Sequence, residues 1–144
     1  MTKINKSALV PYSAEQMYDL VDNIPAYAEF LPWCQSAEEL QRNENEVQGS
    51  LFIAHSGLKK SFTTRNTLDK PNRITMNLVE GPFKHLQGVW TFSPLGDEGC
   101  KVTLDMNFEF SSKLMGLTFG PVFSHMANSL VDAFVQRAND IYGK

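Results

Sequence analysis

Two hydrophobic periods divide the chain into a central region of alternating residues and flanking helical segments. From about Ser36 to Phe110 apolar and polar positions tend to alternate, which predicts β-strands. The alternation is clearest at the end of this region, where every second residue from Cys100 to Phe110 is apolar. A sheet with one dry face and one wet face is typically antiparallel, and its dry face needs a cover.

Turn-forming residues separate the predicted strands. They occur at Asn43-Glu44-Asn45, Ser56-Gly57, Lys70-Pro71-Asn72, Gly81-Pro82 and Gly96-Asp97-Glu98-Gly99. A further strand is predicted from Ile4 to Val10, ahead of the alternating region. The sequence therefore predicts an antiparallel sheet of six to seven short strands.

The C-terminal segment supplies the cover for the dry face. Its apolar residues recur at helical spacing and predict a helix from Pro121 to Tyr142, roughly 33 Å long, with Gly143 as a stop. The apolar stripe comprises Phe119, Val122, Phe123, Met126, Leu130, Ala133, Phe134, Ala138 and Ile141. We expect the sheet to curl around this helix.

Two short helices are predicted between the first strand and the rest of the sheet. Ser13 is a favourable N-cap, and Gln16 three residues later completes a capping box. Pro25 should end or bend the first helix, and a second is expected over Ala26 to Phe30. Residues 1–144 are thus predicted to form one α+β domain.

Composition narrows the functional classes. The chain has 144 residues, 42% of them hydrophobic and 20% charged, as in globular domains. The net charge of −3 argues against general nucleic-acid binding, and we expect no DNA partner. No apolar leader and no run of membrane-spanning length occur in the sequence, which favours a cytoplasmic location.

The chemistry-bearing residues do not form a catalytic or metal-binding motif. His55, His85 and His125 are far apart, and the sequence contains neither a metal-binding nor a nucleophile motif. We therefore expect a non-enzymatic protein that requires no cofactor and no metal. Cys34 and Cys100 are either two buried free thiols or one disulfide, since two cysteines cannot form a disulfide scaffold.

Apolar residues on the dry face and on the helix either fill the core or line a hydrophobic cavity. The candidate lining residues are Leu51, Ile53, Phe62, Met76, Leu78, Leu86, Trp90, Leu104, Met106, Phe108, Phe119, Phe123, Met126 and Leu130. Asn66 and Glu80 share the dry face of their strands and are candidate polar contacts for a ligand. The alternative for Glu80 is a strand end in water, because an unpaired buried carboxylate is costly.

Lysines near two predicted turns form a second candidate site. Lys59 and Lys60 lie near one hairpin tip, and Lys84 follows the Gly81-Pro82 turn. If both turns project from the same end of the sheet, these lysines form a small positive knob for an anionic partner such as ribosomal RNA. The alternative is that they are solvated loop residues.

Three stretches of the sequence together resemble one protein family. They are Phe30-Leu31-Pro32-Trp33-Cys34, the segment from Glu80 to Phe92, and Phe119-Gly120-Pro121-Val122-Phe123 continuing to Arg137-Ala138. In this order they resemble the START-like proteins of the coenzyme-Q-binding, polyketide-cyclase-like group, over essentially the whole chain. The resemblance implies a helix-grip fold with a hydrophobic cavity between the sheet and the C-terminal helix.

The resemblance also implies two roles. One is binding of ubiquinone or a similar isoprenoid lipid in the cavity, in support of respiration. The other, described for bacterial members, is a toxin that binds the large ribosomal subunit, blocks subunit joining and translation, and pairs with a small ubiquitin-like antitoxin. A polyketide-cyclase-like enzyme, or a carrier of another hydrophobic small molecule, is the alternative.

Overall fold

Seven antiparallel strands form one curved sheet in the order β1-β7-β6-β5-β4-β3-β2. The computed structural model describes residues 2–55 and 57–143. The elements are β1 (Thr2–Val10), α1 (Ala14–Asp22), the 3₁₀ helix η1 (Ile24–Glu29), β2 (Cys34–Arg42), β3 (Glu46–His55), β4 (Leu58–Asp69), β5 (Arg73–Glu80), β6 (Phe83–Leu95), β7 (Gly99–Phe110), α2 (Lys113–Thr118) and α3 (Gly120–Tyr142). The predicted α+β class, strand number and element order are confirmed.

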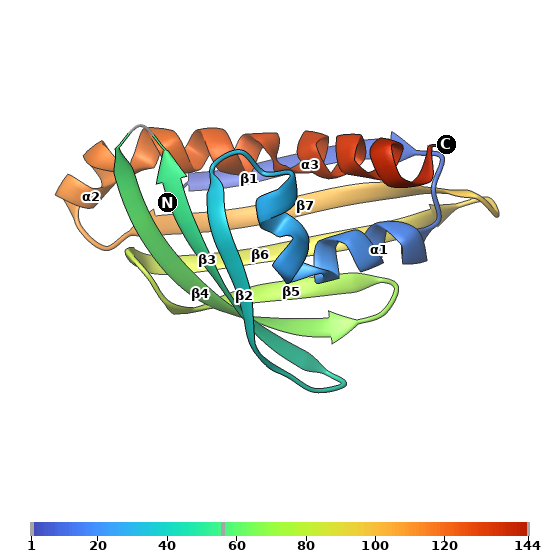
Figure 1. The fold of residues 1–144 in the computed structure, drawn as a ribbon, viewed down its shortest axis with the longest axis horizontal. Helices are drawn as coiled ribbons and strands as arrows, with labels where there is room; N and C mark the ends of the chain where they lie inside the picture. Colours follow the sequence, from blue (N-terminus) through green and yellow to red (C-terminus); the bar gives the residue numbers. More distant parts are fainter. Residues whose placement is uncertain (1, 56, 144) are drawn as a thin grey trace.

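Consecutive hairpins build most of the sheet (Figure 1). The predicted turns separate these strands, except that Ser56, part of one of them, lies outside the described residues. The exception to sequential pairing is β1, which pairs with β7 from the far end of the chain and places Ile4 opposite Met106. The two helices after β1 therefore lead the chain from one edge of the sheet to the other.

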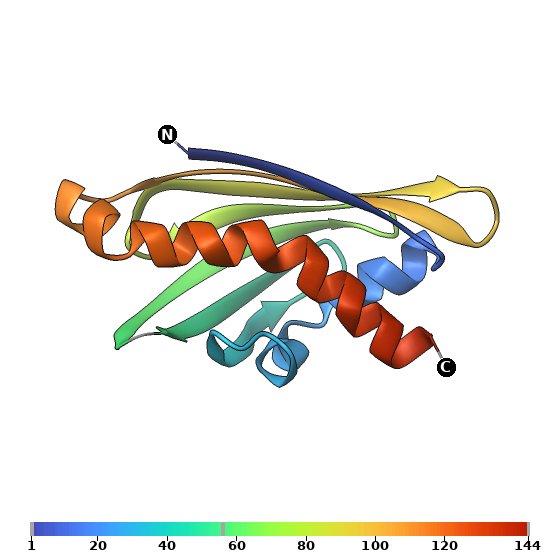
Figure 2. The same cartoon turned by 90° about the horizontal axis from the view of Figure 1, so that it is seen from above.

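Helix α3 runs along the concave face of the sheet (Figure 2). Its buried face includes Phe123, Met126 and Phe134, as the helical spacing predicts, and also Val131, which lies outside the predicted stripe. The prediction that the stripe reaches Ile141 is wrong, because this side chain is 43% exposed. The neighbouring Tyr142 faces inward instead, where its hydroxyl donates a hydrogen bond to the Gln16 carbonyl at 3.2 Å.

Helix α1 begins with the predicted capping box. The Ser13 hydroxyl accepts a hydrogen bond from the Gln16 N–H at 3.1 Å, and the Gln16 side chain accepts one from the Ser13 N–H at 2.9 Å. The helix ends at Asp22, and Pro25 occupies the first turn of η1. Because proline fits an N-terminal turn, the second short helix begins two residues earlier than predicted.

Both cysteines are free, buried thiols, so the disulfide alternative is wrong. Cys34 begins β2 and Cys100 lies on β7, with four strands between them in the sheet. Among the described residues, no helix combines the length and the apolar character needed to cross a membrane.

Candidate functional site

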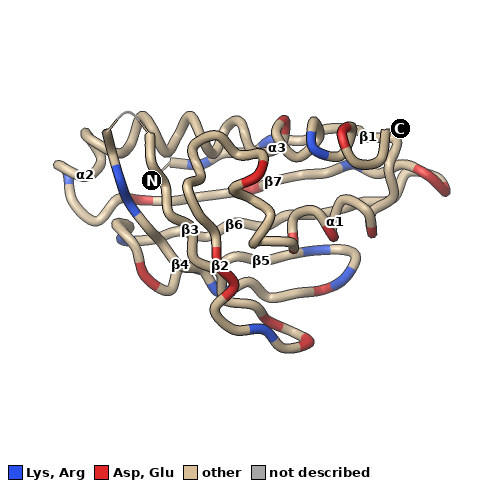
Figure 3. Tube along the Cα trace, viewed as in Figure 1, with Lys and Arg blue, Asp and Glu red and all other residues tan. Residues whose placement is uncertain are grey.

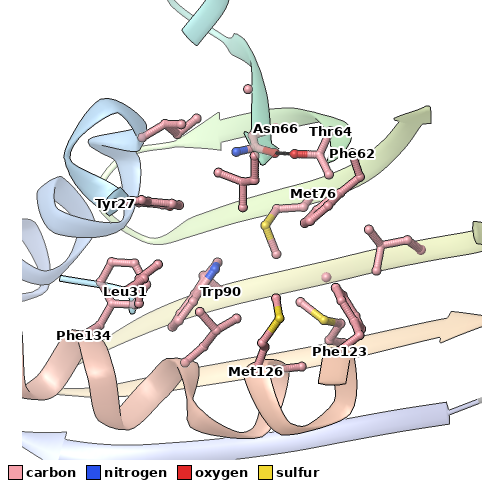
Figure 4. Close-up of a pocket in the computed structure, with 18 of the residues that line it drawn as sticks. Tyr27, Leu31, Phe62, Thr64, Asn66, Met76, Trp90, Phe123, Met126 and Phe134 are labelled. Carbon is pink, nitrogen blue, oxygen red and sulfur yellow. Dashed lines mark hydrogen bonds between the residues drawn. The ribbon is translucent and has the colours of Figure 1, made fainter. Parts of the chain in front are cut away.

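A cavity lies between the concave face of the sheet and α3, with η1 beside it (Figure 4). The total empty volume of the cavity, including solvent at its opening, is about 740 Å³. The volume open to the centre of a water molecule is about 70 Å³. Since one water needs about 10–15 Å³ by the second measure, the cavity holds several waters or a small ring. The core between sheet and helix is therefore not completely filled.

The lining is almost entirely apolar. It consists of Ile24, Tyr27, Leu31, Trp33, Gly49, Leu51, Phe62, Thr64, Asn66, Met76, Leu86, Gly88, Trp90, Met106, Phe123, Met126, Ala127, Leu130 and Phe134. Three of these are methionines, whose unbranched side chains adapt to irregular spaces. The wall can therefore yield to a guest larger than the present empty space.

Gly88 on β6 allows two of these methionines to approach each other. A Cβ atom at this position would lie 2.6 Å from the Met76 methyl carbon and 3.4 Å from that of Met106. Gly88 pairs with both residues in the sheet, Met76 on β5 and Met106 on β7. A larger residue at 88 would displace the methionines into the cavity.

One polar pair interrupts the apolar wall. The Thr64 hydroxyl donates a hydrogen bond to the Asn66 side-chain oxygen at 2.8 Å, and both residues line the cavity from β4 (Figure 4). Asn66 is 6% exposed and Thr64 is 8% exposed. The predicted inward position of Asn66 is confirmed.

Among the residues that the structure describes, the lining contains no aspartate, glutamate, lysine, arginine or histidine. Its one ionisable group, the Tyr27 phenol, donates its hydrogen bond to the Val21 carbonyl. Burial, reinforced by the nearby Asp22, raises the pKa of Tyr27. The described lining thus carries no charged side chain at neutral pH.

An aromatic cluster joins η1 to α3 beside the cavity. The rings of Tyr27 and Phe30 lie 5.5 and 5.1 Å from that of Phe134 on α3. Arg137 covers this cluster, with its guanidinium carbon 5.0 Å from the Phe30 ring centroid and its Nη2 atom 2.7 Å from Oε1 of Glu29. These contacts fix η1 as one wall of the cavity.

The structure separates the predicted lining residues into two groups. Leu51, Phe62, Met76, Leu86, Trp90, Met106, Phe123, Met126 and Leu130 line the cavity. Ile53, Leu78, Leu104, Phe108 and Phe119 do not, and their assignment to it is corrected. Four of these five are 0% exposed because packed core surrounds them, while Leu78 is half-buried outside the wall.

Glu80 does not belong to the cavity. It is the last residue of β5, exposed to solvent, opposite Thr63. A β-bulge between Thr63 and Thr64 shifts the register there, and β5 ends at Glu80, outside the cavity lining. The assignment of Glu80 as a cavity contact is wrong.

Sequence reasoning missed the wall formed by η1 and the loop after it. Ile24, Tyr27, Leu31 and Trp33 all line the cavity. The available signal was the density of apolar and aromatic residues from Ile24 to Trp33, too many for a solvated connection.

The predicted lysines gather toward one end of the molecule. Figure 3 shows basic positions at the start of β4, at the start of β6 and on α2, with acidic positions between them. Lys59 is exposed and Lys60 is half-buried, whereas the Lys84 ammonium lies 3.4 Å from a Glu109 carboxylate oxygen. Because Glu109 neutralises the charge of Lys84, this ion pair reduces the positive charge of the predicted basic patch.

The match that decides the family covers most of the chain. Residues 10–135 match the family described as polyketide cyclase/dehydrase and lipid transport. The chain belongs to this family. Its cavity, between the sheet and α3, is formed largely by residues within the matched range.

Two relatives of this chain carry different names. The chain is 46% identical over 142 residues to the ribosome association toxin RatA of Pseudomonas aeruginosa, covering 99% of both chains. It is 28% identical to the mitochondrial coenzyme Q-binding protein COQ10 homolog B of Xenopus laevis, covering 97% of this chain and 59% of that protein.

Two solved structures share the fold of this chain. A START superfamily protein from Mycobacterium smegmatis superposes with a TM-score of 0.80 at 20% identity, covering 96% of this chain and 98% of that one. The Zhui aromatase/cyclase from Streptomyces sp. R1128 gives 0.82 at 18% identity, with 96% and 93% coverage. At such identities the likeness shows the fold alone.

Proposed function

We propose that this chain is a non-enzymatic protein that binds a neutral, quinone-like lipid in its cavity and associates with the large ribosomal subunit. The observation that carries the first part is the uncharged, methionine-rich cavity between the sheet and α3. Burying apolar ligand surface there gains about 25 cal/mol per Å². The mitochondrial relative named as coenzyme Q-binding supports a quinone as the ligand.

Both tryptophans of the chain line the cavity, which provides a direct binding assay. A benzoquinone with a short alkyl tail, decylubiquinone, should quench their fluorescence in a saturable titration. Native mass spectrometry of the same sample should show one quinone per chain. Absence of saturable quenching and of a bound species would overturn the ligand part of the proposal.

Ribosome association rests on a different observation, the 46% identity to RatA over essentially the full length of both chains. The start of β4 offers the exposed Lys59 and the half-buried Lys60 as phosphate contacts. Because the net charge of the chain is −3, attraction to ribosomal RNA has to come from a patch of basic residues rather than from the overall charge. We further propose, from the family resemblance of the sequence alone, that the protein blocks subunit joining and is countered by a small ubiquitin-like antitoxin.

Sedimentation tests the ribosome role. The wild-type protein should migrate with isolated large subunits through a sucrose gradient, and raising the salt concentration should release it. A variant combining Lys59→Glu and Lys60→Glu should stay at the top of the gradient. Lys101→Glu, which reverses an exposed lysine on β7, is the matched control and should migrate like the wild type. Equal migration of all three proteins would remove these lysines from the contact, and failure of the wild type to bind would reject the role.

The cavity also argues against the cyclase alternative. Cyclisation needs positioned acids and bases, and the described wall offers Thr64, Asn66 and a hydrogen-bonded Tyr27 as its polar side chains apart from tryptophan. The Zhui structure shares the fold at 18% identity, too low to transfer an activity. We therefore propose binding without chemistry.

A further inference from the structure

Two hydrogen-bond donors in the cavity have no protein acceptor. Among the described residues, neither the Asn66 amide nitrogen nor the Trp90 indole nitrogen has a hydrogen-bond partner. Every fully enclosed side-chain nitrogen or oxygen in the described part of the chain does have one. These two nitrogens must therefore face open space, and both residues line the cavity.

Thr64 fixes the orientation of the Asn66 amide. Its hydroxyl donates to the amide oxygen at 2.8 Å, which leaves the NH₂ group on the other side of the amide (Figure 4). Asn66 is 6% exposed and lines the cavity. Both protons of the amide remain available to a guest.

Trp90 is held just as firmly. Its ring is 2% exposed, lies 5.3 Å from the Phe134 ring in an edge-on contact and stacks with Phe92 at 6.4 Å. Figure 4 shows the indole nitrogen on the ring edge that faces the cavity. The indole N–H can only donate, so it too requires an acceptor from the guest or from water.

From these donors we infer that the ligand is recognised by neutral acceptor oxygens, with Asn66 and Trp90 binding carbonyl groups of its head. Thr64 is a positioning residue that holds the amide for this contact. The inference rests on the proposed ligand binding and specifies its chemistry. A buried donor without an acceptor is costly. Binding of a carbonyl ligand is therefore favoured both by burial of its apolar surface and by the hydrogen bonds that its oxygens accept.

The same wall discriminates against two other classes of lipid. A carboxylate would enter without a counter-charge, because the lining contains no lysine, arginine or histidine. A pure hydrocarbon would leave both donors unpaired. We therefore expect decylubiquinone to bind more tightly than either palmitate or dodecylbenzene.

The test compares affinities for decylubiquinone and dodecylbenzene, the latter measured by displacement of the quinone. Asn66→Leu should weaken quinone binding about three- to tenfold, the usual effect of losing one hydrogen bond, and should not weaken dodecylbenzene binding. Thr64→Val should give a smaller loss of quinone affinity and no further loss when combined with Asn66→Leu. Thr67→Val, the same change at an exposed position of β4, is the control.

The outcomes separate this inference from the function on which it rests. If the wild type binds neither probe, the proposed ligand binding fails and the inference fails with it. If both probes bind and Asn66→Leu leaves their affinity ratio unchanged, only the inference is overturned. Should Asn66→Leu not fold, Trp90→Phe provides the second test, and it must lower the same ratio.

Discussion

Replacing Ala127 by leucine tests whether the space beneath α3 is available to a guest. Ala127 is 1% exposed, lies on α3 and lines the cavity. Leucine would add three carbon atoms to this wall of the cavity. The volume open to the centre of a water molecule there is about 70 Å³. The substitution should therefore take up part of this space without touching the polar pair on β4.

The stability of this variant follows from two opposing terms. Burying three more carbon groups gains about 2 kcal/mol at about 0.8 kcal/mol each. Strain from inserting a side chain into a packed region costs about 1–3 kcal/mol. The free energy of unfolding of Ala127→Leu should thus stay within about 1 kcal/mol of the wild-type value, as measured by urea denaturation.

Ligand binding should respond differently. With less space beneath α3, the affinity for decylubiquinone should fall at least about tenfold, equivalent to about 1.4 kcal/mol. Ala133→Leu, on the same helix but half-buried and outside the lining, should keep wild-type affinity. Unchanged quinone binding by Ala127→Leu would place the ligand elsewhere. Destabilisation well above 2 kcal/mol would show that Ala127 already abuts a full core, and either result would refute the reasoning.

Two further predictions concern Arg137 and Cys34, which lie outside the cavity lining. Arg137→Ala removes the ion pair with Glu29 and the contact over Phe30, so it should lower the free energy of unfolding by about 1 kcal/mol and speed release of bound quinone in a stopped-flow chase. Unchanged release would show that this contact does not restrain η1. Burial raises the pKa of the Cys34 thiol from its ordinary 9.0 to about 11, so iodoacetamide should label the native thiol at pH 8 far more slowly than the urea-unfolded one. Because the unfolded thiol ionises first, stability should fall as the pH rises from about 9 to about 11, and Cys34→Ala should reduce that slope.

Alternation along the strands made much of the cavity wall predictable. Met76, Trp90 and Met106 lie on the dry faces of three neighbouring strands, and a period of two assigns each to the inside. The same rule assigns Leu104 and Phe108 to the inside, where they are packed rather than exposed to the cavity. Whether an inward residue meets another side chain or empty space depends on sheet curvature and on the path of α3, which the period does not contain.

The wall formed by η1 was harder to predict for a different reason. Six residues of 3₁₀ helix carry no repeat long enough to show which face is buried. Tyr27 and Leu31 enter the cavity because contacts with Phe134 and the ion pair with Arg137 fix the segment against α3. Such long-range contacts have no local signature in the sequence.

The different positions of Asn66 and Glu80 show how the fold controls which polar groups the cavity holds. Both share a strand face with apolar residues, so periodicity alone treats them alike. Asn66 lies within β4 opposite Met76, and its oxygen is satisfied by Thr64. Glu80 ends β5 beside a bulge, where its carboxylate is solvated. Burying that charge unpaired would cost far more than burying an amide, so the arrangement keeps the cavity neutral and favours a guest that is neutral as well.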